Sequence, residues 1–186
     1  NNPGGVEYPA PVMAAFRDLA RRRGIALIVD ETYRDFHSVI GPPHDLLSDP
    51  DWDETVITLY SFSKSFRLTG HRVGAIIASG ARLREAEKFL DCVAICPAQV
   101  GQIGALWGVR NLTEWLAGER LEILDRRAAM EAAFQRLPDW HLQGCCAYFA
   151  YAPCLCQCRC GGAGAVGRAI VRPHVIGPLA PPAPSP

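Results

Sequence analysis

Lysine is scarce in this sequence, and long apolar runs are missing. Only Lys64 and Lys88 are lysines among 19 basic residues, and the 19 acidic residues bring the net charge to zero. A neutral chain has no overall field that attracts nucleic acid or an anionic membrane. No apolar run approaches the roughly 20 residues of a membrane span, and no signal-peptide pattern opens the chain. We therefore predict a cytoplasmic protein without nucleic-acid or membrane partners.

Length and composition indicate one main domain and part of another. The chain has 186 residues, of which 49% are hydrophobic and 20% charged, close to the globular average, which excludes a wholly disordered chain. Domains usually have about 100 to 150 residues. Because the sequence begins at Asn1 rather than Met, we expect a fragment of a longer protein.

Hydrophobic periodicity predicts alternating strands and helices. Expected strands cover 25–29, 55–60 and 73–78, and expected helices cover 9–23, 81–91, 97–110 and 113–137. Strands joined through helices indicate an α/β fold with a mostly parallel sheet flanked by helices. The alternating segment 147–151 predicts the first strand of a second domain.

Periodicity and composition together divide the chain into four parts. We expect a partial large domain at 1–112, a long interdomain helix at 113–137 and the start of a small domain at 138–152. Residues 153–186 are rich in Cys, Gly and Pro, and form an atypical tail.

Polar residues follow the first predicted strand. Asp30 comes directly after the apolar run 25–29, at the edge where open α/β sheets bind ligands, and Tyr33 lies three residues further on. The alternative for Asp30 is that it caps a short helix beginning at Glu31.

A second polar group follows the next strand. Lys64 lies among small hydroxyl residues, where a desolvated amine can form an imine with a carbonyl, although most lysines are solvated surface residues. The hydroxyls of Ser61 and Ser63 and the guanidinium of Arg72 are suited to a phosphate. An imine-forming lysine, a phosphate site and a carboxylate such as Asp30 are what pyridoxal 5'-phosphate requires.

These motifs resemble the class I and II aminotransferases, the aspartate aminotransferase family. The resemblance covers residues 1 to about 151, and rests on Asn-Pro-Gly-Gly at the start, Asp-Glu-x-Tyr after a strand, and Ser-x-Ser-Lys followed by Arg-Val-Gly. It implies the large domain of this pyridoxal-phosphate fold, truncated at its N-terminus, with only the start of the small C-terminal domain.

The resemblance also implies a role for each motif residue. Lys64 carries the cofactor as an internal aldimine and later moves the proton at the substrate Cα, and Asp30 pairs with the pyridinium nitrogen. Asn2 and Tyr33 hold the phenolic oxygen. The residues implied for the phosphate are Ser61, Arg72 and Ser63.

The implied activity is transfer of an amino group from an amino acid to a 2-oxo acid by a homodimer. The same core in this family also supports carbon-sulfur lyases and cyclopropane-forming synthases, so these remain alternatives. The family's substrate-carboxylate arginine has no matching context after Tyr151, and its ring-stacking aromatic residue would precede Asn1. We therefore expect the chain alone to be inactive or nearly so.

The tail leaves three further interpretations open. Alternating cysteines at 154, 156, 158 and 160 would allow a Cys-rich metal-binding chain without enzymatic function, but they lack the paired C-x-x-C spacing of structural zinc, and we predict no metal. The glycines at 162–167 match a dinucleotide fingerprint in letters only, because no apolar strand precedes them. A shift of reading frame near Ala152 would explain the change in composition.

Overall fold

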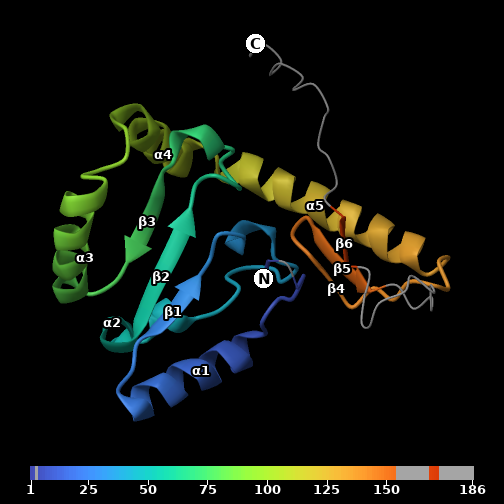
Figure 1. Ribbon diagram of the computed structural model, residues 1–186, viewed down its shortest axis with the longest axis horizontal. Helices are drawn as coiled ribbons and strands as arrows, with labels where there is room; N and C mark the ends of the chain where they lie inside the picture. The colour runs from blue at the N-terminus through green and yellow to red at the C-terminus, as the bar shows by residue number, and fades with distance from the viewer. Residues whose placement is uncertain (3, 154–167, 172–186) are drawn as a thin grey trace, which may run out of the picture.

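The computed structural model describes residues 1–2, 4–153 and 168–171, and within them it forms two small sheets with helices around them. Figure 1 shows α1 near β1 of the first sheet, and α3 and α4 near β3. The long helix α5 runs toward the second sheet. The α/β class expected from the sequence is confirmed.

The first sheet has the order β1-β2-β3 and is mixed. Strands β1 (Leu27–Asp30) and β2 (Val56–Ser61) are parallel, with Leu27 opposite Val56, whereas β3 (Gly74–Ile77) runs antiparallel to β2. A parallel crossover usually needs a helix of its own. The connection from β2 to β3 holds only turns and the short 3-10 helix η3 (Thr69–His71), so the described sheet has one parallel and one antiparallel pair.

The four predicted helices are all present, with ends displaced by at most three residues, as α1 (Ala10–Arg23), α3 (Gly80–Val93), α4 (Gln99–Asn111) and α5 (Thr113–Phe134). The sequence analysis did not predict the short helix α2 (Trp52–Thr55) or the 3-10 helices η1 (Arg34–Phe36) and η2 (Leu46–Ser48). Gly24 ends α1 in a left-handed conformation, and the Ser79 hydroxyl caps α3. In the described part of the chain, no helix combines the length and the hydrophobicity needed to cross a bilayer.

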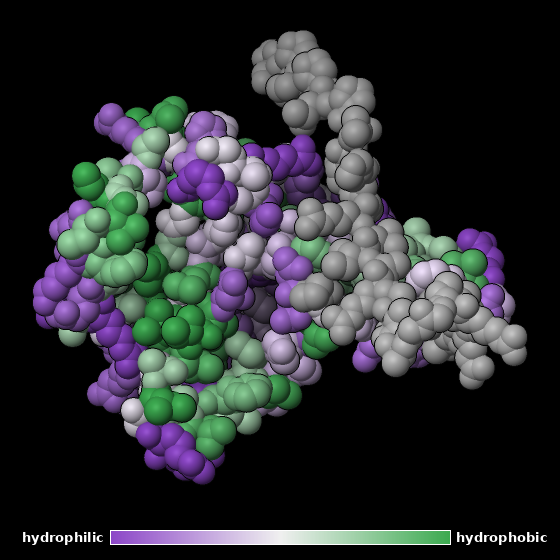
Figure 2. All heavy atoms as spheres, in the orientation of Figure 1, coloured by the Kyte–Doolittle hydropathy of each residue, from purple (hydrophilic) through white to green (hydrophobic). Residues whose placement is uncertain are grey.

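Two buried clusters hold these elements together. Val29, Leu46 and Val56 form the first, against which Met13 of α1 packs. The opposite face of the first sheet is uncovered, since Ile28 remains 61% exposed. Figure 2 shows hydrophobic surface gathered over this sheet, near α3.

The second cluster joins α5 and the second sheet to the segment after β1. It consists of Phe36, Ile123, Ala147 and Phe149, with Tyr33 packed against it. Apolar burial of this kind is the main stabilising contribution in such contacts. It therefore fixes Tyr33 between the two sheets.

The second sheet corrects one prediction. Its strands are β4 (Gly144–Cys146), β5 (Phe149–Pro153) and β6 (Arg168–Val171). Ala147 and Tyr148, predicted to be in a strand, instead form the turn between β4 and β5, where Ala147 has a φ of 48°. Strand β6 pairs antiparallel with β5, although its residues fall in the predicted tail. The predictions for residues 154–167 and 172–186 lie outside the described residues.

The N-terminal turn approaches the second sheet closely. Gly5 has a φ of 62°, and a Cβ placed on it would lie 2.8 Å from the carbonyl carbon of Gly144. Only glycine fits such a contact in a left-handed conformation. This contact holds the N-terminal turn, which includes Asn2, against the second sheet.

Candidate active site

The ends of the three strands of the first sheet meet at one edge. Asp30 is the last residue of β1 and Ser61 the last of β2, while Gly74, opposite Ser61, begins β3. Because β1 and β2 are parallel and β3 returns, the carboxyl ends of two strands and the start of the third coincide. The segments with Asp30, Lys64 and Arg72 therefore all leave the sheet at this edge.

Asp30 is oriented by the turn that follows it. Its Oδ1 accepts hydrogen bonds from the Thr32 amide at 3.0 Å and from the Thr32 hydroxyl at 2.6 Å. The next helical residue is Arg34, so Asp30 caps a turn and not a helix beginning at Glu31. The carboxylate is exposed, and within the described residues its Oδ2 accepts no hydrogen bond.

Asn2, Asp30 and Tyr33 line one cavity of about 740 Å³. The Asn2 Nδ2 atom donates to the Tyr33 hydroxyl at 3.4 Å, and the Tyr33 ring packs edge-on against Phe149 at 5.0 Å. Edge-on aromatic contacts add to the stabilisation that burial provides. The structure thus brings together three of the residues predicted to bind the cofactor.

Ser61 ends β2, and Ser63 and Lys64 lie in the tight turn that follows; none of the three lines this cavity. The Ser63 amide donates to the Ser61 hydroxyl at 3.3 Å, and the Thr69 hydroxyl donates to the Ser63 carbonyl at 2.8 Å. Lys64 is half-buried, and its Nζ makes no hydrogen bond or ion pair with any residue that the structure describes.

Lys88 differs from Lys64 both in its exposure and in having an ion-pair partner. Its side chain is 71% exposed, and Nζ lies 2.7 Å from Glu85 Oε1 one turn earlier in α3. This is an ordinary solvated ion pair of a helix surface. Of the two lysines, Lys64 is the one at the sheet edge.

Arg72 is near the same edge, but its guanidinium is directed toward the Thr69 carbonyl. Its backbone is left-handed, with a φ of 50°, and Nη1 donates to the Thr69 carbonyl at 3.1 Å. The residue lines a separate cavity between β3 and α3. The structure therefore does not gather Arg72 with Asn2, Asp30 and Tyr33.

Three glycines of α4 press against the loop after Lys64. A Cβ on Gly108 would lie 2.8 Å from Phe66 Cδ1, and one on Gly101 would lie 3.1 Å from the His71 carbonyl oxygen. Gly104 faces Leu68 in the same row. The spacing of three and four residues places all three on one helix face, a signal that our sequence analysis did not use.

Our sequence analysis also missed a group of charged side chains around the buried Glu31, the residue that follows Asp30. Arg34 Nη1 contacts both carboxylate oxygens of Glu31, at 2.8 and 3.0 Å, and His44 Nε2 lies 2.6 Å from Glu31 Oε1. Burial acts to raise the pKa of Glu31, but the His44 hydrogen bond and the Arg34 charge outweigh it and lower the pKa. The spacing of Glu31 and Arg34 is visible in the sequence, whereas nothing local marks His44.

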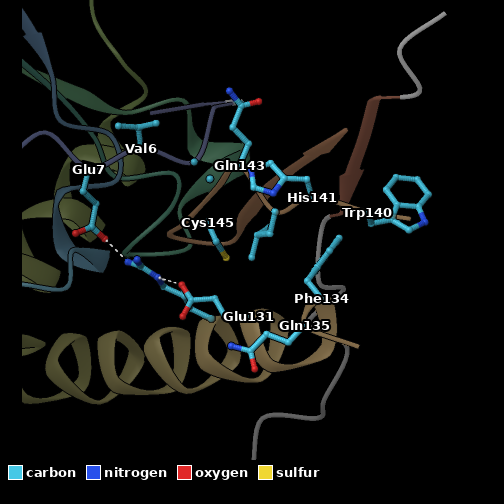
Figure 3. A pocket seen from close by; sticks show the side chains of 13 residues that line it. Val6, Glu7, Glu131, Phe134, Gln135, Trp140, His141, Gln143 and Cys145 are labelled. Atoms are coloured by element: carbon cyan, nitrogen blue, oxygen red, sulfur yellow. Dashed lines mark hydrogen bonds and ion pairs between the residues drawn. The ribbon is translucent and has the colours of Figure 1, made fainter. Parts of the chain in front are cut away.

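A third cavity, of about 690 Å³, lies between α5 and the second sheet. Arg127 forms ion pairs with Glu7 at 3.1 Å and with Glu131 at 2.8 Å, and Figure 3 shows these two carboxylates in the lining of the cavity. Burial raises the pKa of Cys145, which faces the same cavity. None of the predicted site residues lines it.

The side-chain groups near the sheet edge are of the chemical types that pyridoxal phosphate requires. A carboxylate, a phenol and an amide line one cavity, while an amine, two hydroxyls and a guanidinium lie outside it, at the end of β2 and in the loop that follows. Among residues 1–2, 4–153 and 168–171, no group of three or more His, Cys, Asp or Glu side chains could hold a metal ion.

Comparison with known proteins identifies the family. A family model described as aminotransferase class I and II matches residues 1–154. The chain belongs to this family. An aspartate aminotransferase of Sulfurisphaera tokodaii is 28% identical over 114 residues, 61% of this chain. An aromatic aminotransferase of Arabidopsis thaliana is 26% identical over 147 residues, 77% of this chain.

Solved structures agree on the fold of this aminotransferase-family chain. An N-succinyldiaminopimelate aminotransferase from Mycobacterium tuberculosis superposes with a TM-score of 0.75 at 20% identity, and an aspartate aminotransferase from Thermus thermophilus with 0.72 at 21%. Each superposition covers 82% of this chain and 40% of the other. The chain likewise spans 28% and 36% of the two sequence relatives.

Proposed function

We propose that this chain forms the cofactor-binding part of a pyridoxal-phosphate-dependent aminotransferase that transfers an amino group from an amino acid to a 2-oxo acid. The observation that carries the proposal is that a carboxylate, a phenol and an amide line one cavity at the sheet edge where the half-buried Lys64 also lies. When bound, pyridoxal phosphate supplies an electron sink for the reacting carbon.

Asp30 is suited to hold a proton on the pyridine nitrogen. An ionised carboxylate favours a charged partner, and the two hydrogen bonds from Thr32 fix its orientation. Tyr33 and Asn2, which already pair with each other, would bind the ring oxygen.

Lys64 is the amine proposed to attach the cofactor and to move the proton at the substrate Cα. An amine can do this only when it is not held in an ion pair, and Nζ makes none with the described residues. The phosphate would be bound by Ser61, Ser63 and Arg72, whose guanidinium must leave the Thr69 carbonyl to do so.

The substrate pair, the homodimeric assembly and the cytoplasmic location remain predictions. The relatives are named for aspartate, for aromatic substrates and for histidinol phosphate, so their names do not agree on one substrate. We propose an amino acid and a 2-oxo acid as the substrate classes.

Reductive labelling tests the attachment site. The chain is incubated with pyridoxal phosphate, reduced with borohydride and digested, and we expect the pyridoxyl group on the peptide that contains Lys64. Because Lys88 is the one other lysine in the sequence, the two peptides are readily distinguished.

Two variants complete this experiment. Lys64→Ala should lose the label together with the absorbance of the bound cofactor, whereas Lys88→Ala should keep both. Label on Lys88, or equal labelling of Lys64→Ala, would overturn the assignment.

A further inference from the structure

The segment that carries Tyr33 is attached to β2 at both ends. At its start, the Glu31 amide donates to the Leu59 carbonyl at 2.8 Å. At its end, the Tyr60 hydroxyl donates to Asp35 Oδ2 at 2.5 Å. Residues 31–35 therefore form a short loop fixed to two consecutive residues of the neighbouring strand.

Tyr60 also contacts the segment that carries Lys64. Its ring centroid lies 5.1 Å from that of Phe62 and 6.4 Å from that of Phe66, in both cases edge-on. Phe62 and Phe66 are two residues before and two residues after Lys64. A displacement of the Tyr60 ring would therefore also displace the turn around Lys64, because closely packed side chains transmit strain to one another.

The hydrogen bond from Tyr60 to Asp35, which joins the two segments, is a strong one. Burial first, and then the hydrogen bond to Asp35, raise the pKa of Tyr60, so that its hydroxyl remains protonated and is the donor. A short O–H···O bond to an ionised carboxylate is about twice as strong as a bond between neutral groups. Neither Asp35 nor Tyr60 lines the cavity of Asn2, Asp30 and Tyr33.

We propose that Asp35 and Tyr60 are positioning residues that hold the segment of Asp30 and Tyr33 in fixed register with the segment of Ser61 and Lys64. For its consequence in cofactor binding, this inference rests on the proposed function. The two residues touch neither cofactor nor substrate, and they act by keeping the two sets of binding groups at a constant separation.

Tyr60→Phe tests the inference because it removes the hydroxyl and keeps the ring. We expect it to weaken binding of pyridoxal phosphate about threefold to tenfold, the effect of losing one hydrogen bond. The matched control is Tyr151→Phe, in β5 of the other sheet, which should bind as tightly as wild type.

A double-mutant cycle assigns the effect to the pair. Asp35→Ala should weaken binding in the wild-type background and have little further effect in Tyr60→Phe, since the partner hydroxyl is already absent. Additive losses would show that the two residues act separately and would contradict the proposal.

Amide hydrogen exchange provides a measurement that needs no cofactor. In Tyr60→Phe, exchange should become faster in residues 31–35 and 62–66 and stay unchanged in α1. Equal acceleration throughout the chain would indicate a general loss of stability, and unchanged exchange in both segments would also overturn the inference. If wild type bound no pyridoxal phosphate, the proposed function would fail, but the exchange data would still decide whether the two segments are coupled.

Discussion

The two groups of predicted cofactor residues leave the same edge of the first sheet, yet they are held in place by different means. On the Asp30 to Tyr33 side, Tyr33 packs in an apolar cluster, but Asp30 and Glu31 are held by polar contacts. Thr32 orients Asp30, and His44 and Arg34 hold Glu31. These contacts are directional and depend on charge. This side should respond to changes of a single polar atom.

The Ser61 to Arg72 side is held by close packing and by its backbone, with hydrogen bonds inside the loop and an ion pair of the exposed Arg67 with Glu119 that contributes little. Arg67 and Arg72 adopt left-handed conformations, with φ of 56° and 50°, that residues other than glycine rarely adopt. Gly108 of α4 leaves no room for a methyl group beside Phe66. This side should respond to changes of volume more than to changes of charge.

The largest effect is expected for Asp30→Asn. A neutral amide cannot hold the pyridine nitrogen protonated, so under the proposed function the variant of the complete enzyme should lose at least about 100-fold in amino transfer while the cofactor remains bound. Cofactor absorbance and transfer rate are measured on the same preparation. The exposed Asp139→Asn is the control, and an unchanged rate in Asp30→Asn would contradict the assigned role.

Arg72→Ala should have the next largest effect. Losing one charge-assisted contact to a phosphate weakens cofactor binding about tenfold to a hundredfold. Titration with pyridoxal phosphate checks this, with the exposed Arg84→Ala as control. Equal affinity of the two variants would mean that Arg72 stays bonded to Thr69 and does not reach the phosphate.

The sequence predicts this edge better than it predicts how the edge is held. Asp30 and Ser61 are recognisable because polar residues directly follow apolar runs, and Gly24 marks the end of α1. The contact between Asp35 and Tyr60 joins residues 25 positions apart and has no local pattern. The turn at Ala147 was missed because alternation of residue types does not reveal a left-handed φ.

Gly108→Ala tests the packing on the Lys64 side. The added methyl would meet the Phe66 ring at 2.8 Å, so we expect a loss of about 1 to 3 kcal/mol in the free energy of unfolding, together with weaker cofactor binding. Gly118→Ala on α5 is the matched control, because a Cβ there has no neighbour within 4 Å. It should be neutral or stabilise the helix by up to about 1 kcal/mol. Equal stability of the two variants would show that α4 can move away without cost.

The smallest effect, and the one that depends most on pH, is expected for Glu31→Gln. At neutral pH the variant should be about 1 to 2 kcal/mol less stable, because the ionised Glu31 binds Arg34 and His44. The folded-state pKa of Glu31 is lowered, so its contribution is present above the unfolded pKa near 4.3 and is lost as the pH falls through the folded pKa. The stability difference between wild type and variant should therefore shrink as the solution becomes more acidic than about pH 5. Urea unfolding from pH 7 to pH 3 measures it, with the exposed Glu85→Gln as control. A difference that persists unchanged to pH 3 would show that Glu31 acts through its shape and not through its charge.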